Sequence, residues 1–248
     1  MDEMKPWWKT WPVLGVAALL VVLALGGGGM ILSSKLGEAG GSESVPASPS
    51  SGGSEAAPAV PAGDGEASVC GLTAREDELG KLETEAPVTE WESLGNQLVT
   101  KQNDEHGPGV VEDDGFRYCY ARTPEGVLFA AANFVTFGSS SDGNLTSKAA
   151  QKLIDAGDRQ EEFEAQMKEG GSGGSAPIIA YRVDRYSASS ATVTLVLEFE
   201  GTKVAGTLDF AWSGGDWKVR APGTGNVGYR MEKIENLAGY VPWGVANG

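Results

Sequence analysis

The sequence predicts an α+β domain that follows a single N-terminal transmembrane helix and a disordered linker. Three observations predict this order in the 248-residue chain. Residues 13–32 form a charge-free apolar run, residues 37–69 are almost devoid of large apolar side chains, and beyond residue 123 the hydrophobic spacing changes from helical to alternating. About three helices should therefore pack on an antiparallel sheet of about four strands, and we expect residues 70–248 to fold as one unit.

The apolar run is long enough to cross a bilayer, since a helix needs about 20 residues to span about 30 Å of hydrocarbon. Lys5, Lys9 and the amino terminus precede it, and Lys35 follows it. This bias predicts a cytoplasmic stub at residues 1–12, a transmembrane helix at residues 13–36 that contacts the lipid, and an extracytoplasmic C-terminal domain in the cell membrane.

A cleaved signal peptide is the alternative to a retained signal anchor. The strongest apolar stretch, residues 13–25, has the length of a signal-peptide core, and residues 24–26 read Ala-Leu-Gly, which fits a cleavage site. Met30, Ile31 and Leu32 resume the apolar run after four glycines, and glycine is tolerated in lipid. We therefore favour the anchor.

Composition predicts that the linker is disordered and limits the classes of molecule that the chain can bind. Of the 33 residues at 37–69, 25 are Gly, Ser, Ala or Pro, so this segment cannot bury enough apolar surface to order itself. The formal net charge of −15 disfavours direct contact with nucleic acid. One histidine and two cysteines exclude a Cys/His zinc cluster, and we expect no metal and no cofactor.

The two cysteines, Cys70 and Cys119, would both lie outside the reducing cytosol, where disulfides persist. Only one intramolecular pairing exists, and closing that loop would stabilise the fold by about 4 kcal/mol. We predict a disulfide between them. Two buried thiols, or two cysteines too far apart to bridge, are the alternatives.

Residues 70–122 are predicted to form an acidic, mostly extended strap. Within residues 76–114, twelve acidic side chains face only two lysines, which gives a charge of −10. Proline and glycine interrupt the segment repeatedly, so we expect extended chain wrapped on the domain, with a short helical turn near Trp91. The acidic triplet at residues 112–114 lacks the pattern of a calcium loop and is interpreted as a solvated face.

The α+β domain is assigned to residues 123–248. Thr123, Pro124 and Glu125 fit the start of a helix that ends near Gly138, and further helices are expected at residues 146–156 and 158–169. Alternation then predicts four strands joined by hairpin turns, at residues 178–187, 191–200, 203–212 and 216–220. In the first strand, the alternation places Ile179, Tyr181 and Val183 on the core face and Arg182 and Asp184 on the other.

The order of elements, with the Trp-x4-Trp-Lys-Val ending at residues 212–219, resembles the nuclear-transport-factor-2-like fold, a cone in which a curved sheet wraps the helices. An anchor, a tether and such a domain together resemble the bitopic subunits of type IV secretion machines used in conjugation. Five further motifs lie along the extracytoplasmic domain: Cys70-Gly71-Leu72, Gly107-Pro108-Gly109, Cys119 to Gly126, Ala130 to Phe134 and Leu237 to Trp243. In these residues the chain is similar to an uncharacterised actinobacterial membrane-anchored family associated with conjugative and integrative elements.

Four motifs could suggest chemistry, and each has a plainer interpretation. Residues 223–228 fit G-x-G-x-x-G but lack a following βαβ unit, which favours a turn. His106 has no nucleophile marked beside it. Tyr181 and Asp184 have opposite parity in a strand and should lie on different faces. The Asn144 sequon is a motif common by chance. No catalytic residue is predicted.

Two functions of different class remain. The first, implied mainly by the resemblance, is a non-enzymatic scaffolding subunit of a conjugative transfer complex that makes protein–protein contacts with other envelope proteins; self-association is left open. The second is an extracytoplasmic binding module, or an enzyme, that uses the cone cavity for a small or lipidic ligand. A deep apolar pocket with convergent polar groups would favour the second, and a filled interior would weaken it.

Overall fold

The computed structural model describes residues 67–155, 161, 165, 167, 176–220 and 230–245. The predicted transmembrane helix at residues 13–36 lies outside these ranges, as does the linker except for residues 67–69. Among the described residues, no helix is both long and apolar enough to cross a bilayer.

Two helices are described in full, and both begin at a side-chain cap. Helix α2 (Pro124–Gly138) starts where the sequence predicts, because the hydroxyl of Thr123 accepts the Gly126 N–H at 3.0 Å. Helix α3 (Gly143–Leu153) starts and ends three residues before the prediction, since the carboxylate of Asp142 caps it and the next two residues join the sheet. Of the third predicted helix, only residues 161, 165 and 167 are described, and all three are helical.

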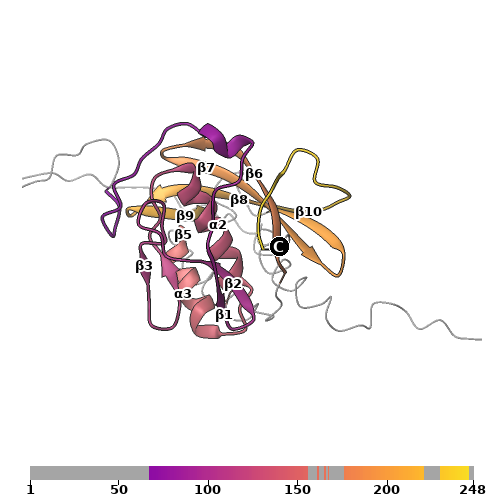
Figure 1. Ribbon diagram of the computed structural model, residues 1–248. Coiled ribbons are helices and arrows are strands. Elements are labelled where there is room, and N and C mark those ends of the chain that lie inside the picture. The colour runs from indigo at the N-terminus through magenta and orange to yellow at the C-terminus, as the bar shows by residue number, and fades with distance from the viewer. Residues whose placement is uncertain are drawn as a thin grey trace, which may run out of the picture.

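A seven-stranded sheet forms the other layer (Figure 1). Its spatial order is β11-β6-β7-β8-β9-β5, with β10 paired to the first half of β8. The strands are β5 (Ile154–Asp155), β6 (Ile178–Ser187), β7 (Ser190–Phe199), β8 (Thr202–Ser213), β9 (Asp216–Arg220), β10 (Arg230–Ile234) and β11 (Val241–Pro242). The predicted antiparallel four-strand meander is therefore present as β6 to β9, while β5 adds a parallel edge and the C-terminal segment adds β10 and β11.

Helices α2 and α3 cover one face of the sheet, and the main core lies between the two layers. Val193, Leu195, Leu208 and Phe210 project from the sheet into this core, as their alternation predicts. The opposite face carries no helix among the described residues. Part of it is covered by the segment around Leu237 and Tyr240.

One predicted core position is wrong. The register between β6 and β7 shifts between Ile178 and Ala180, so Ile178 enters the main core beside Tyr181. Ile179 faces the opposite side, where it packs with Val196. A bulge adds one residue to a strand, so the side chains on its two sides follow opposite alternation. A prediction that assumes unbroken alternation cannot detect this change.

The strap contains more regular structure than predicted. It forms a short 3-10 helix, η2 (Gly80–Glu83), and two small hairpins, β1 (Trp91–Leu94) with β2 (Gln97–Thr100) and β3 (Val110–Val111) with β4 (Arg117–Tyr118). The helical turn expected near Trp91 is wrong, because Trp91 begins β1. A two-residue turn with Gly95 at φ 62° reverses the chain there, and glycine adopts this conformation without strain.

Part of the acidic charge is used inside the fold rather than solvated. Lys148 on α3 binds Glu112 at 2.6 Å and also binds Asp114, and Lys152 binds the second oxygen of Glu112. The expectation of a solvated face at residues 112–114 therefore holds only for Asp113, which is exposed.

Candidate functional site

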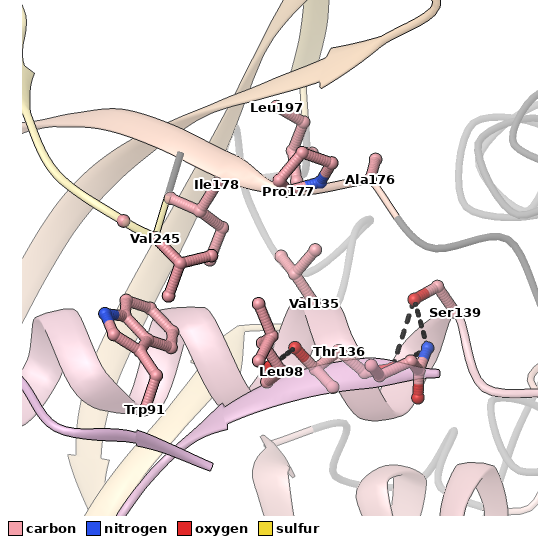
Figure 2. Close-up of a pocket in the computed structure, with 12 residues that line it drawn as sticks. Trp91, Leu98, Val135, Thr136, Ser139, Ala176, Pro177, Ile178, Leu197 and Val245 are labelled. Atoms are coloured by element: carbon pink, nitrogen blue, oxygen red, sulfur yellow. Dashed lines mark hydrogen bonds between the residues drawn. The ribbon is translucent and has the colours of Figure 1, made fainter. Parts of the chain in front are cut away.

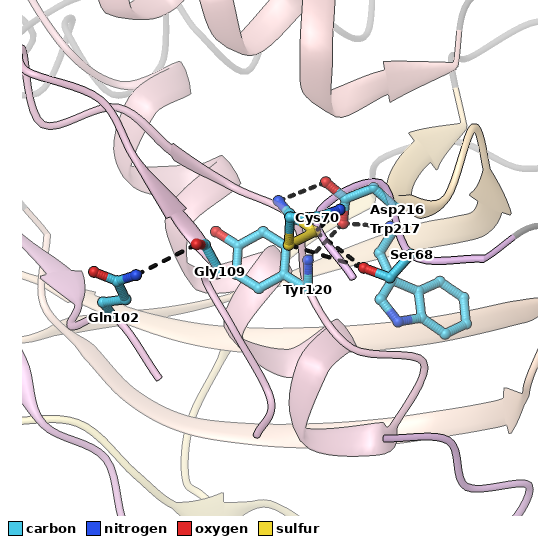
Figure 3. The surroundings of a disulfide bond; sticks show 8 residues. Ser68, Cys70, Gln102, Gly109, Tyr120, Asp216 and Trp217 are labelled. Atoms are coloured by element: carbon cyan, nitrogen blue, oxygen red, sulfur yellow. Dashed lines mark hydrogen bonds between the residues drawn. A yellow bond between two sulfur atoms is a disulfide. The ribbon is translucent and has the colours of Figure 1, made fainter. Parts of the chain in front are cut away.

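The predicted disulfide is present. Cys70 and Cys119 are bonded, with Cα atoms 6.2 Å apart, which lies within the ordinary range. The bond joins the start of the strap to the residue after β4 (Figure 3). The Val69 N–H donates to the Gly215 carbonyl at 2.9 Å, so this first segment is also tied to the β8–β9 turn. The strap is thus held to the sheet at its beginning.

A buried carboxylate supports the same junction. Asp216, at the start of β9, accepts the backbone N–H groups of Cys119 at 2.7 Å, Tyr120 at 2.8 Å and Trp217 at 2.8 Å (Figure 3). Burial raises the pKa of Asp216 from 3.8 to about 6, against the opposing effect of these three donors. We call Asp216 and these three N–H groups the Asp216 clamp; its geometry is that of a structural tie.

The space between helix and sheet is filled by aromatic side chains. The Trp243 ring lies 6.2 Å from Phe129, 5.6 Å from Tyr181 and 5.0 Å from Trp91, measured between ring centroids. Tyr181 is fully buried, and its hydroxyl donates to the Leu82 carbonyl at 2.9 Å. The described part of the domain therefore has an interior occupied by its own side chains.

A small cavity remains between the β1–β2 hairpin, α2 and the start of β6 (Figure 2). Its volume is about 50 Å³, and Trp91, Leu98, Val135 and Ile178 are among the residues that line it. A single water occupies about 30 Å³ of liquid, so this cavity is far smaller than the pockets of about 300–1,000 Å³ that hold ligands. It does not provide the ligand cavity that the second function requires.

His106 lies in a polar cleft of about 420 Å³ at the N-terminal end of α2, together with Glu125 and Phe129. Its Nδ1 is 3.2 Å from the Thr123 hydroxyl, and its Nε2 is 3.8 Å from a Glu105 oxygen. Burial raises the pKa of Glu125, whose Oε2 is buried without a hydrogen-bond partner among the described residues. The cleft thus brings together a candidate acid and a candidate base.

No activated nucleophile accompanies this pair in the described part of the chain. The cleft's two threonine hydroxyls are engaged elsewhere: Thr89 donates to the Pro87 carbonyl, and Thr100 accepts the side-chain amide of buried Asn133 at 2.7 Å. A general base needs a proton to abstract within hydrogen-bond reach. The arrangement therefore gives no support to a catalytic role for His106.

The helix-free face of the sheet carries the most distinctive polar arrangement. Two rows of residues, paired from strand to strand, cross it side by side. The first row is Arg182 on β6, Thr194 on β7, Thr207 on β8 and Arg230 on β10, and the second is Arg185 on β6, Thr192 on β7, Asp209 on β8 and Arg220 on β9. Arg220 joins the second row because it follows Val219, which pairs with Phe210. Each row therefore has an arginine at both of its ends.

These rows line two adjoining hollows of about 780 and 530 Å³, which share Arg185 and Thr192. We call the whole feature the arginine trough. One wall is formed by Arg182 and Arg185, and the other by Arg220 and Arg230. The floor between the walls is formed by the inner residues of the two rows, which are Thr194, Thr207, Thr192 and Asp209. The trough contains four of the eight arginines of the chain.

The polar groups of the floor are satisfied within the trough. The Thr192 hydroxyl donates to Asp209 at 2.6 Å, and the Thr194 hydroxyl donates to Asp184 at 2.6 Å. Arg182 donates to the other oxygen of Asp184 at 2.6 Å and lies over the Tyr240 ring at 4.7 Å. Two of the three carboxylates in the trough are therefore occupied.

The other three arginines differ from Arg182. Within the described ranges, the guanidinium groups of Arg185, Arg220 and Arg230 have no carboxylate within 4.0 Å and make no hydrogen bond to another described residue. The third carboxylate, Glu232 on β10, lines the larger hollow and also has no such ion pair. On a strongly acidic chain, the trough thus presents three guanidinium groups that no carboxylate of the described residues pairs.

The sequence-predicted candidates are dispersed rather than gathered in one site. Tyr181 lies in the core and Asp184 on the helix-free face, which confirms the prediction that they lie on different faces of the sheet. Asn144 lies in the first turn of α3, and its amide donates to Asp114 at 2.9 Å. The glycine motif at residues 223–228 lies outside the described residues.

Sequence reasoning missed the trough because it missed a second bulge. The β6–β7 register shifts between Val183 and Arg185, which leaves Asp184 and Arg185 on the same face. Two consecutive charged residues within an alternating strand were the available signal, since one of them would otherwise point into the core.

Comparison with known proteins places the chain in a family. Residues 49–242 match the model of a domain of unknown function, DUF8175. The chain belongs to this family. The disulfide, the Asp216 clamp and the arginine trough all lie within the matched residues of the DUF8175 domain.

No curated protein matches the chain significantly. Among solved structures, it is similar to an NTF-2 like protein of unknown function from Silicibacter pomeroyi, with 12% sequence identity and a TM-score of 0.29. The similarity covers 45% of this chain and 99% of that one. At this score the likeness is distant, and no conclusion about the DUF8175 domain rests on it.

Proposed function

We propose that this protein is a single-pass, membrane-anchored scaffolding subunit whose DUF8175 domain lies outside the cytoplasmic membrane and acts through protein–protein contacts. The charge-free run at residues 13–32 and the small-residue linker at 37–69 support an anchor and a tether. The disulfide between Cys70 and Cys119 supports an oxidising compartment.

The observation that carries the proposal is the arginine trough. Arginine is enriched where proteins contact one another, because its planar guanidinium makes several directed hydrogen bonds. The described interior of the domain is filled by aromatic side chains such as Phe129, Tyr181 and Trp243. The helix-free face is hollowed, and it carries guanidinium groups that no carboxylate among the described residues pairs. A recognition surface therefore fits this geometry better than an internal ligand site.

The finer proposal is that the complex is a conjugative, type IV secretion-like machine. It is supported by the resemblance of the anchor, tether and α+β domain to the bitopic subunits of such machines. We therefore expect the partners to be other envelope proteins of the transfer complex.

Deletion in the native host tests this proposal directly. Conjugative transfer frequency should fall by orders of magnitude on deletion, and the full chain supplied in trans should restore it. Site-specific photo-crosslinkers placed in the trough, at Ser187 of the smaller hollow and Met231 of the larger one, should capture an envelope subunit of the transfer machine, whereas the same probe at Val88, an exposed residue of the strap, should not. Unchanged transfer on deletion would refute the conjugative role, and capture of no envelope protein would refute the scaffold role.

A further inference from the structure

We propose that the arginine trough binds an extended, carboxylate-rich segment of a partner protein. The segment would lie along β7 and β8. Its successive side chains would point in turn to the two walls, one toward the arginines of β6 and the next toward those of β9 and β10. This inference rests on the proposed scaffolding function and names the chemistry of the partner.

The spacing of the walls fits one extended chain. Each row crosses three strand-to-strand intervals, so its two arginines stand about 14 Å apart at the backbone, which leaves room for a strand between two inclined side-chain walls. The two rows are separated by two residues along β7, from Thr192 to Thr194, or about 7 Å. Side chains two apart on an extended peptide have the same separation, so successive carboxylates on one side meet successive arginines.

The charges indicate the ligand class. Arg185, Arg220 and Arg230 have no carboxylate within 4.0 Å in the described part of the chain, and guanidinium groups bind carboxylates with paired, charge-assisted hydrogen bonds. Hydroxyl groups of Ser187 and Ser190 line the smaller hollow and add polar partners. A run of Asp or Glu residues would supply the missing anions.

Two other anionic surfaces fit less well. A membrane surface attracts uniformly basic patches, whereas Asp184, Asp209 and Glu232 stand among these arginines and would face the lipid headgroups. A second copy of this chain would bring another −15 charges and thus a general repulsion. An extended acidic segment can direct its carboxylates toward the arginine walls on either side, which a planar array of headgroups cannot do, and it need not come from a partner with a large net negative charge.

The experiment uses the full chain in nanodiscs of phosphatidylcholine, whose headgroup carries no net charge. The probe is a fluorescent oligo-glutamate of about eight residues, long enough to pass both rows, and the control peptide is a serine–glutamine oligomer of equal length. Binding is followed by fluorescence anisotropy at about 0.1 M salt and again at higher salt. The test variant is Arg185→Gln with Arg230→Gln, and the control variant is Arg75→Gln, an exposed arginine on the strap, outside the trough.

The oligo-glutamate should bind the wild type, and binding should weaken as salt rises. The double variant should bind about tenfold more weakly, since each lost exposed ion pair accounts for several-fold in affinity, while Arg75→Gln should stay within about twofold. Equal thermal unfolding of the three proteins would show that the variants are folded.

Each contrary result would overturn the inference. No binding at about 1 mM peptide, equal binding of the control peptide, or equal binding by the double variant would show that the trough does not recognise carboxylates. Self-association that the double variant abolishes would assign the trough to a second copy. Binding to phosphatidylglycerol vesicles that the double variant abolishes, without oligo-glutamate binding, would assign it to lipid.

Failure here is distinguishable from failure of the proposed function. If the oligo-glutamate does not bind but deletion still abolishes transfer, the scaffold proposal stands without an acidic ligand. If the oligo-glutamate binds but deletion changes nothing, the ligand class stands and the conjugative role is lost.

Discussion

The buried carboxylate of Asp216 should make the stability of this protein depend on pH in the direction opposite to that of an ion-paired surface acid. Its pKa is raised from 3.8 to about 6 by burial, so the native state holds the proton more tightly than the unfolded chain does. The contribution of Asp216 to stability is therefore complete below a pH of about 3.8 and is lost as the pH rises toward 6. The difference of about two pKa units corresponds to about 3 kcal/mol.

The substitution Asp216→Asn removes this titration and keeps the shape of the side chain. It also turns one oxygen into an amide that faces backbone donors, so at least one of the N–H groups of Cys119, Tyr120 and Trp217 loses its acceptor. A buried donor without an acceptor costs about 1–3 kcal/mol. At pH 4, where the native carboxyl is itself protonated, the variant should be less stable than the wild type by at most this amount, and between pH 4 and pH 7 the difference should shift by about 2–3 kcal/mol in favour of the variant.

Urea denaturation at a series of pH values, with the disulfide intact, measures this difference because most other titrations cancel between the two proteins. The matched control is Asp113→Asn at an exposed aspartate of the strap, for which the difference from the wild type should be small and constant. A difference for Asp216→Asn that stays constant with pH, or that shifts in favour of the wild type as pH rises, would refute the reasoning.

Three further predictions concern single features of the fold. Replacing Cys70 and Cys119 by serine should lower the free energy of unfolding by about 4 kcal/mol, matching the reduced wild type in urea denaturation; a loss below about 1 kcal/mol would contradict the role of the bond. Thr123→Ala should cost about 1 kcal/mol through loss of the α2 cap, whereas Thr123→Ser should cost little, and equal effects would exclude a capping role. Burial raises the pKa of Glu125, so its contribution to stability falls as the pH rises through that pKa; Glu125→Gln should therefore gain stability relative to the wild type between pH 4 and pH 7, and an equal difference at both pH values would contradict this account.

Features set by local sequence were predicted well. The start of α2 follows from Thr123 and Pro124, because capping involves only neighbouring backbone groups. The four-strand meander follows from alternation within each strand. The pairing of Cys70 with Cys119 follows from counting, since a chain with two cysteines has one intramolecular pairing, whereas the formation of the bond was predicted from the expected extracytoplasmic location.

Features set by non-local contacts were missed. The bulges at Ile178/Ala180 and Val183/Arg185 depend on how β6 pairs with β7, and no local pattern marks them apart from the adjacent charges of Asp184 and Arg185. Asp216 sits in a turn-like stretch after two glycines, where an acid is ordinary, and only the arrival of Cys119 and Tyr120 from the strap makes it a buried tie. The arginine trough required both the bulge and the sheet order to be known.

The placement of the folded domain outside a membrane is tested most directly by thiol labelling of the full chain in cells with a membrane-impermeant maleimide–polyethylene glycol reagent. The protein should remain in the membrane pellet after a carbonate wash and carry no label as isolated. On intact cells it should gain label at Cys70, which is exposed whereas Cys119 is buried, once an impermeant reductant has opened the disulfide between them. A soluble protein that takes up label only after lysis and without reductant would contradict our account.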